Sequence, residues 1–380
     1  MGHRDESADR MRPIVVRQPQ GPVEEVTEAD ALDAILDERA MLVRGPLFGV
    51  VAQDTQDTQD TQDAGDAGDA SPWRVVVPVV AGCPQEARDS LNSLLWFRAK
   101  DDAQDRAERR ALLAAVARLE SERVDELTVL GTRYRVVRAE EYTAAGPDGI
   151  EQPRPTDPEP SVPNWDRGAR EPGIDDGLVL DPEAAVTPVQ AAERLARRQL
   201  AYTGARFPED VLNDSERALD THPDVLLLPA LFRIVEQDGA AWKAASGLHA
   251  GAHEARKTLD FSLTWFEPRR RGLIAWDSED RNADARTVTA KGTDAATPEL
   301  AAYAEAADRL RAERANRIEV QGTVHQVCRA RRLLRWGTDG PEGPRPSDID
   351  SHPPEQIRPL LDEDGTIHYE DEEEDEDHDG

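Results

Sequence analysis

Two segments in the first half of the chain carry apolar residues at helical spacing. Residues 86–99 and residues 106–123 each repeat an apolar residue every three or four positions, so one side of each segment is apolar. The stripe residues are Ala87, Leu91, Leu94 and Leu95 in the first segment and Leu112, Leu113, Val116 and Leu119 in the second. This pattern predicts two consecutive amphipathic helices that pack against a core.

Segments typical of strands flank this helix pair on both sides. They are rich in β-branched and apolar residues and are bounded by turn residues, which predicts antiparallel hairpins. We expect strands at residues 41–52 and 73–80 for the first hairpin, and at 126–129 and 134–141 for the second, which turns at Leu130-Gly131. A helix capped by Thr27 is expected to precede the first hairpin. The element order is therefore α-β-β-α-α-β-β.

The chain contains an internal repeat. Residues 118–159 align with residues 309–350 without a gap, and glycines, prolines and arginines make up half of the shared residues. The second copy repeats the hairpin at residues 225–236 and 241–244, and it repeats the second helix with Thr297 as its cap and Pro298 at its first position. An extra helix that starts at Thr187-Pro188 and runs to about Ala201 belongs to the second copy alone.

The pattern predicts an α+β fold made of two tandem copies of the α-β-β-α-α-β-β unit. Each copy is expected to have an antiparallel sheet of about four strands packed by helices. The predicted organisation is an N-terminal arm (1–26), copy 1 (27–160) with a disordered acidic insertion (54–70), a linker (161–177), copy 2 (178–352) with a loop insertion (267–298), and a disordered acidic tail (353–380).

The charge of the chain is concentrated in two places. The net charge is −31, and residues 362–380 hold twelve acids without a Lys or Arg, while residues 54–69 hold six more acids. Such segments bury too little apolar surface to offset the entropy of ordering, so we expect them to be disordered. No apolar run is long enough to cross a membrane. The isolated cysteines Cys83 and Cys328 fit a reducing, cytoplasmic location.

Several phrases resemble an uncharacterised actinobacterial family known only as a domain of unknown function. These phrases are Val-Asp-Glu-Leu-Thr-Val-x-Gly (124–131), Tyr-Arg-Val-Val-Arg (134–138), Gly-Pro-Asp-Gly (146–149), Pro-Arg-Pro-Thr-Asp (153–157) and the acidic C-terminus. The resemblance implies a duplicated unit and covers most of residues 12–380. It implies no activity. In the second copy Thr338 replaces Pro147, and His325 replaces Tyr134, which suggests that this copy has drifted.

No catalytic motif stands out in the chain. It has no phosphate-binding loop of the P-loop type, no dinucleotide-binding glycine pattern and no nucleophile elbow. His249 and His253 are four residues apart, but Gly247 and Gly251 argue against a helix that would bring them together. We therefore predict no catalytic residue, no cofactor and no metal site.

A basic cluster is the most suggestive charge feature. The last strand of the second copy is expected to carry it, and the arginines of the proline-rich segments join it as a possible interaction surface. The residues concerned are Arg329, Arg331, Arg332, Arg335, Trp336, Arg154 and Arg345. A basic strand beside an aromatic residue is typical of nucleic-acid binding. The strongly acidic chain argues against nucleic acid, and pairing with neighbouring acids is the simpler interpretation.

Two function hypotheses follow from these observations. The first is a non-enzymatic cytoplasmic interaction or regulatory protein on a duplicated scaffold. Its acidic tail would contact a basic partner protein or fold back on residues 329–335. The second is an enzyme or small-ligand binder with its site at the seam between the two copies. A deep pocket at the seam with converging charged groups would favour the second hypothesis, and a flat, filled interface would count against it.

Overall fold

The structure is a computed structural model of the 380-residue chain. It describes residues 11–55, 71–147, 149–239, 241–277, 280, 282–292 and 296–369. Most of the predicted acidic insertion at 54–70 lies outside the described residues. The same is true of the end of the predicted tail, from residue 370 onward.

Helices occur at the predicted segments 86–99, 106–123 and 187–201 and after Thr297, with differences at the ends, and further helices occur outside these segments. In chain order the helices are α1 (Pro22–Asp37), α2 (Pro84–Phe97), α3 (Arg106–Ser121), α4 (Pro188–Arg197), α5 (Glu209–Thr221), α6 (Ala252–Phe261), α7 (Glu267–Arg270), α8 (Ala285–Lys291) and α9 (Pro298–Glu313). Single π-helical turns follow α2 and α6, at Arg98–Asp102 and Ser262–Phe266. The segment 267–298, expected as a loop, therefore contains α7 and α8.

Local capping explains where several helices begin. Asp105 caps α3 by accepting hydrogen bonds from two backbone N–H groups, and Thr297 caps α9 in front of Pro298 as predicted. Helix α1 begins at Pro22, after Gly21, and not at Thr27. The hydroxyl of Thr27 instead donates to the carbonyl of Val23 within the helix, 2.9 Å away. The expected boundary between arm and first copy at residue 27 thus falls inside α1.

The strands of both halves form a single antiparallel sheet. Its members are β1 (Ala40–Asp54), β2 (Trp73–Ala81), β3 (Glu126–Val129), β4 (Thr132–Gly146), β5 (Gly149–Ile150), β6 (Val179–Leu180), β7 (Asp224–Asp238), β8 (Ala241–Ala244), β9 (Arg317–Val320), β10 (Thr323–Gly337) and β11 (Gly340–Pro341). The main order is β6-β2-β1-β4-β10-β7-β8. This confirms the α+β class. Each half supplies its predicted hairpins, but the two sheets are joined into one.

The joint between the halves is a short pairing of β4 with β10. Arg332 lies opposite Glu141, and Leu333 lies opposite Glu140. In the ungapped alignment of the repeat, residue 141 corresponds to residue 332. The two halves therefore meet at matching positions of their last long strands. We call this joint the seam. The duplication itself stays a prediction from the sequence.

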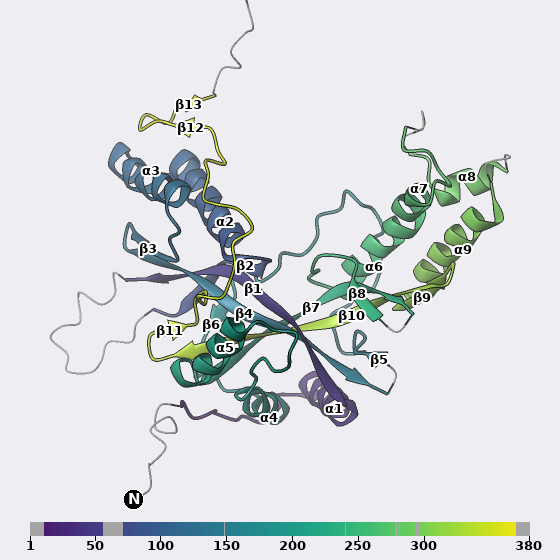
Figure 1. The fold of residues 1–380 in the computed structure, drawn as a ribbon, viewed down its shortest axis with the longest axis horizontal. Helices are drawn as coiled ribbons and strands as arrows, with labels where there is room; N and C mark the ends of the chain where they lie inside the picture. Colours follow the sequence, from purple (N-terminus) through teal and green to yellow (C-terminus); the bar gives the residue numbers. More distant parts are fainter. Residues whose placement is uncertain are drawn as a thin grey trace, which may run out of the picture.

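Helices cover the sheet in separate groups (Figure 1). Helices α2 and α3 pack near one end and α6 to α9 near the other, while α1 and α4 lie together on the opposite side. Each end has its own apolar core. One is built around Phe48, Leu95 and Leu119, and the other around Phe232, Leu259 and Leu310. Among the described residues no helix is both long and apolar enough to span a membrane.

The described part of the C-terminal segment packs against the first half. Trp96 on α2 donates its indole N–H to the carbonyl of Pro359, at 3.0 Å. The strands β12 (Leu360–Leu361) and β13 (Ile367–His368) form a small separate hairpin, and Leu361 joins the core of the first half. Residues 353–369 therefore differ from the expected disordered tail, because their apolar and carbonyl groups find partners on α2 and α3.

Candidate functional site

The residues predicted to form a basic interaction surface are buried in the structure, except Arg154 and Arg329, which are half-buried. Their exposed fractions run from 0% for Arg332 to 17% for the side chain of Arg329. The others are Arg154, Arg331, Arg335, Trp336 and Arg345. They are covered because β10 lies in the middle of the joined sheet, beside β4 and β7. A continuous exposed basic strand, as nucleic-acid binding requires, is not formed by these residues.

The two proline-rich segments, residues 146–160 and 337–350, each form an ion pair with a strand of the other half across the seam. Arg138 on β4 pairs with Asp348, at 3.0 Å, and Arg329 on β10 pairs with Asp157, at 3.1 Å. Residues 138 and 329 correspond in the repeat, as do 157 and 348. Each half thus supplies a strand arginine to the segment of the other half, which holds the two halves in register.

Arg154 and Arg345 make matching local contacts in the two segments. The Arg154 guanidinium pairs with Glu151, and that of Arg345 pairs with Glu342, each at 2.8 Å. Their backbone N–H groups donate to the aspartates three residues further on. Both arginines therefore pair with an acid three residues before them in the chain, while their backbone binds the aspartate.

One position of opposite charge in the two copies has compensating partners. Residue 331 is arginine where the first copy has Glu140. Arg331 pairs with Glu151, at 2.6 Å, and Glu193, at 2.8 Å, whereas Glu140 pairs with Arg345, at 3.2 Å. The halves therefore differ in charge at this position, while Arg331 and Glu140 each keep a partner of opposite charge.

A cavity of about 390 Å³ lies beside the seam, between α1, α4 and the strands β4, β7 and β10. We call it the seam cavity. Its charged lining consists of Arg154, Arg194, Arg329, Arg331, Arg332 and Glu193. Its apolar lining comes mainly from Val186, Val189 and the leucines 226–228. The cavity therefore combines a cationic wall with an apolar wall.

Arg194 differs from the other arginines of this wall. Its guanidinium donates to the backbone carbonyls of Val225, at 2.8 Å, and Pro182, at 3.1 Å. Within the part of the chain that the structure describes, no carboxylate lies within ion-pair distance of it, and its Nη1 atom has no hydrogen-bond partner. Burial, and then the nearby Arg198, lower the pKa of Arg194. An anion beside this residue would relieve an uncompensated buried charge.

The acid and the phenol in the cavity wall are held in fixed protonation states. Burial alone would raise the pKa of Glu193, but Arg331 and a hydrogen bond from Tyr142 outweigh it and lower the pKa. Burial and the adjacent Glu193 raise the pKa of Tyr142. The Tyr142 hydroxyl donates to Glu193, at 2.8 Å. Glu193 therefore stays ionised and Tyr142 stays neutral, which suits binding better than proton transfer.

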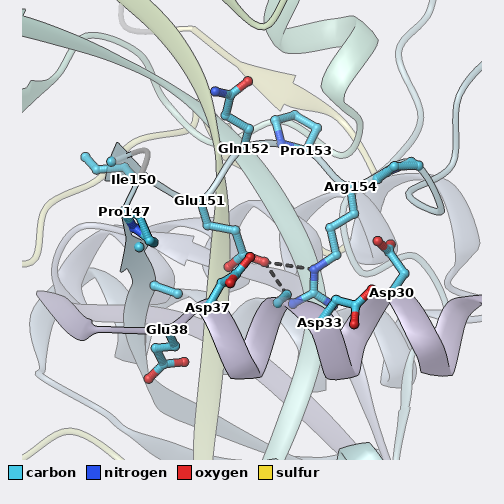
Figure 2. Close-up of a pocket in the computed structure, with 15 residues that line it drawn as sticks. Asp30, Asp33, Asp37, Glu38, Pro147, Ile150, Glu151, Gln152, Pro153 and Arg154 are labelled. Atoms are coloured by element: carbon cyan, nitrogen blue, oxygen red, sulfur yellow. Dashed lines mark hydrogen bonds and ion pairs between the residues drawn. The ribbon is translucent and has the colours of Figure 1, made fainter.

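A second pocket opens on the other side of Arg154, between α1 and the segment 146–155. Its volume is about 310 Å³. Figure 2 shows Asp30, Asp33 and Asp37 on α1 facing the segment that carries the paired Glu151 and Arg154. Arg154 is the basic residue in the lining of this pocket, and it is already paired with Glu151. The aspartates of α1 therefore form an acidic wall. Arg154 thus lines both this acidic pocket and the cationic seam cavity.

Two important residues were not singled out in the sequence. Arg194 lies on α4, the helix without a counterpart in the first copy, and that asymmetry is the signal that points to it. Asp175 lies in the segment expected to be a linker, yet it forms a fully buried pair with Arg332 at 2.6 Å. No group of three His, Cys, Asp or Glu side chains in the described ranges is arranged to hold a metal ion.

The comparisons with known proteins identify a family and no activity. No curated protein and no solved structure matches the chain. A family model described as a family of unknown function (DUF5954) matches residues 21–351, which include both halves and the seam. The chain therefore belongs to the DUF5954 family of unknown function.

Proposed function

We propose that the protein binds a small organic anion with an apolar part, and that the ligand occupies the seam cavity. The observation that carries the proposal is Arg194, a buried guanidinium in the cavity wall without a carboxylate partner among the described residues. The other four arginines of the wall each pair with an acid, whereas Arg194 makes no ion pair among the described residues and feels Asp224 and Asp181 only through space. A buried cation of this kind favours an anionic ligand.

The size and lining of the cavity support the same ligand class. Small-molecule sites commonly enclose roughly 300–1,000 Å³, are mostly apolar and contain a few polar groups that orient the ligand. The seam cavity has about 390 Å³, and Val189 and Leu227 offer apolar contacts on α4 and β7. A carboxylate with a short aliphatic chain would place its charge near Arg194 and its tail against these residues.

Binding to octanoate tests the proposal. The purified full-length protein is titrated calorimetrically with octanoate, octylamine and octanol, which share a tail and differ in charge. We expect octanoate to bind and to raise the thermal unfolding midpoint, because a ligand that binds only the folded state stabilises it. We expect octylamine and octanol to bind at least about tenfold more weakly, a difference of about 1.4 kcal/mol.

Two variants locate the site. Arg194→Gln removes the charge and is expected to weaken octanoate binding about tenfold or more. Arg194→Lys keeps the charge and is expected to retain part of the binding. Ala31→Met fills the cavity from half-buried α1 and should also weaken binding, whereas Ala29→Met, on an exposed position of the same helix, should not. Equal binding of octanoate and octylamine, or unchanged octanoate binding in Ala31→Met, would refute the proposal.

A role as an interaction protein is our second candidate, because α1 exposes apolar residues. Val26 is 60% exposed and Leu36 is 69% exposed. We also propose a cytoplasmic location, since Cys83 and Cys328 are both buried free thiols. The proposed contact of the acidic tail with a basic partner concerns mainly residues outside the described ranges. The described part folds back on α3 through Glu363 and Arg110, at 2.7 Å, and not on residues 329–335.

A further inference from the structure

Helix α1 is weakly covered by the rest of the molecule. None of its residues is buried, and its main helical neighbour is α4. The two helices lie side by side in Figure 1, away from the groups formed by α2 and α3 and by α6 to α9. A 16-residue helix without a buried residue is unusual, because helices in proteins gain most of their stability from packing one apolar face.

An apolar groove of about 460 Å³ runs between α1 and α4. Leu32 and Ile35 line it from α1, and Val189 and Ala192 line it from α4. Leu32 is 46% exposed. Two further leucines extend the apolar surface on the two helices, since Leu36 is 69% exposed and Leu195 is 56% exposed. We call this surface the α1–α4 groove.

Negative charge borders the apolar residues of the groove. Helix α1 contains six acids and no Lys or Arg. Glu25, Glu28, Leu32 and Leu36 follow one another at intervals of three or four residues, so they form one stripe along the helix. Glu28 accepts a hydrogen bond from the backbone of Val189, at 2.6 Å, while no ion pair of Glu25 occurs among the described residues.

We propose that the α1–α4 groove is a docking surface for a basic amphipathic helix of another protein. A helix with leucine-like anchors at intervals of three, four and seven residues fits an apolar groove between two helices. Lysine or arginine flanking those anchors would meet the acids of α1, and such complementarity speeds association and selects partners. A second copy of this chain would instead bring another acidic α1 to the same face.

The docking surface is separate from the proposed ligand site. Thr27 and Ala31 of α1 line the seam cavity, whereas Leu32 and Ile35 line the groove. Val189 on α4 borders both. Substitutions at exposed groove residues are therefore expected to leave octanoate binding unchanged, which allows the two proposals to fail independently.

Three synthetic peptides test the docking surface on the full-length protein. The first is a fluorescein-labelled 18-residue peptide of Leu and Lys in an amphipathic helical pattern. The second has Glu in place of Lys, and a third scrambles the Leu/Lys pattern at equal composition. We expect binding of the patterned Leu/Lys peptide by fluorescence anisotropy, weakened by 0.5 M salt, and at least tenfold weaker binding of the other two.

Variants show whether the peptide uses the groove. Leu32→Ser with Leu36→Ser should weaken binding of the Leu/Lys peptide at least tenfold, and Glu25→Lys, on the same stripe, should weaken it further. Val162→Ser is the matched control, since Val162 is 80% exposed and lies elsewhere. Circular dichroism verifies that each variant is folded. The proposal is overturned if the double serine variant binds the peptide as the unchanged protein does, or if the scrambled peptide binds equally well. Self-association that is lost in the double variant would assign the surface to a second copy and would also overturn it.

Discussion

Arg332 and Asp175 form an ion pair at 2.6 Å in which neither side chain has exposed area. Arg332 also donates to the backbone carbonyls of Val79 and Pro229. The contacts of Arg332 thereby join three parts of the chain to the central strand β10. These parts are strand β2, strand β7 and the segment that precedes β6. A salt bridge in such a position contributes little compared with an apolar pair, but removing one partner leaves a buried charge without compensation.

We therefore predict strong coupling between these two residues. Arg332→Met and Asp175→Asn should each lower the free energy of unfolding by about 3–5 kcal/mol. The double variant Arg332→Met/Asp175→Asn should lose clearly less than the sum of the two, because no unpaired charge remains. Urea denaturation of the three variants measures this. Additive losses would show that the pair is not coupled.

Cys328 is predicted to be unreactive in the folded protein. Burial raises the pKa of its thiol to about 12, against a small opposite effect of Arg233. At pH 8 the reactive thiolate is therefore scarce. Mass spectrometry after iodoacetamide treatment should find Cys328 unmodified in the native protein and rapidly alkylated in urea. Rapid alkylation without denaturant would contradict the buried environment.

The C-terminal segment is predicted to detach in acid. A hydrogen bond from His368, then one from the backbone of Thr366, lowers the pKa of Asp362 to about 2. Arg110 holds the pKa of Glu363 at about 2 as well. Carboxylates with lowered folded pKa values stabilise the folded state above their ordinary pKa near 4, and this stabilisation is lost as the pH falls towards 2.

Hydrogen exchange of residues 360–369 measures that detachment. Protection should be constant from pH 7 to pH 5, after correction for the intrinsic exchange rate, and should decrease between pH 5 and pH 2. Strands β4 and β10 in the centre of the sheet provide the internal control. A segment that keeps its protection at pH 2 would show that these carboxylates do not hold it.

The cap of α4 is predicted to matter for the seam cavity. Thr187 and Gln190 form a capping box at the start of the helix that carries Glu193 and Arg194. Thr187→Ala should cost about 1 kcal/mol of stability and weaken octanoate binding, because the wall of the cavity loses its fixed position. Thr221→Ala at the exposed end of α5 is the control and should leave octanoate binding unchanged.

Local patterns predicted much of the fold. The second hairpin turns at Leu130-Gly131 as expected, and both residues have positive φ, at 50° and 73°. A two-residue turn of this kind requires that conformation, and glycine at its second position makes the turn readable from sequence. The corresponding Gln321 and Gly322 have φ values of 49° and 76°. Turns and amphipathic helices depend on residues that are close together in the chain, so both can be predicted from the sequence.

The burial of the arginines could not be predicted in the same way. Arg331 looks like a surface residue because its partners Glu151 and Glu193 are more than a hundred residues away in the chain. Only the joining of β4 to β10 brings these groups together. The start of α1 was missed for a simpler reason. Pro22 after Gly21 is the start signal that the structure uses, and Thr27 also has the side chain of a typical cap.

The pairing of β4 with β10 also limits how the chain can be divided. A protein cut within residues 161–177 would leave each fragment with a long strand whose backbone donors and acceptors lack the neighbour they have here. Such an open strand edge recruits other strands, which leads to aggregation. The two fragments are therefore expected to be insoluble when produced singly and to complement one another when produced together. The peptide link between the halves therefore supplies each exposed strand edge with its neighbour from within the same molecule.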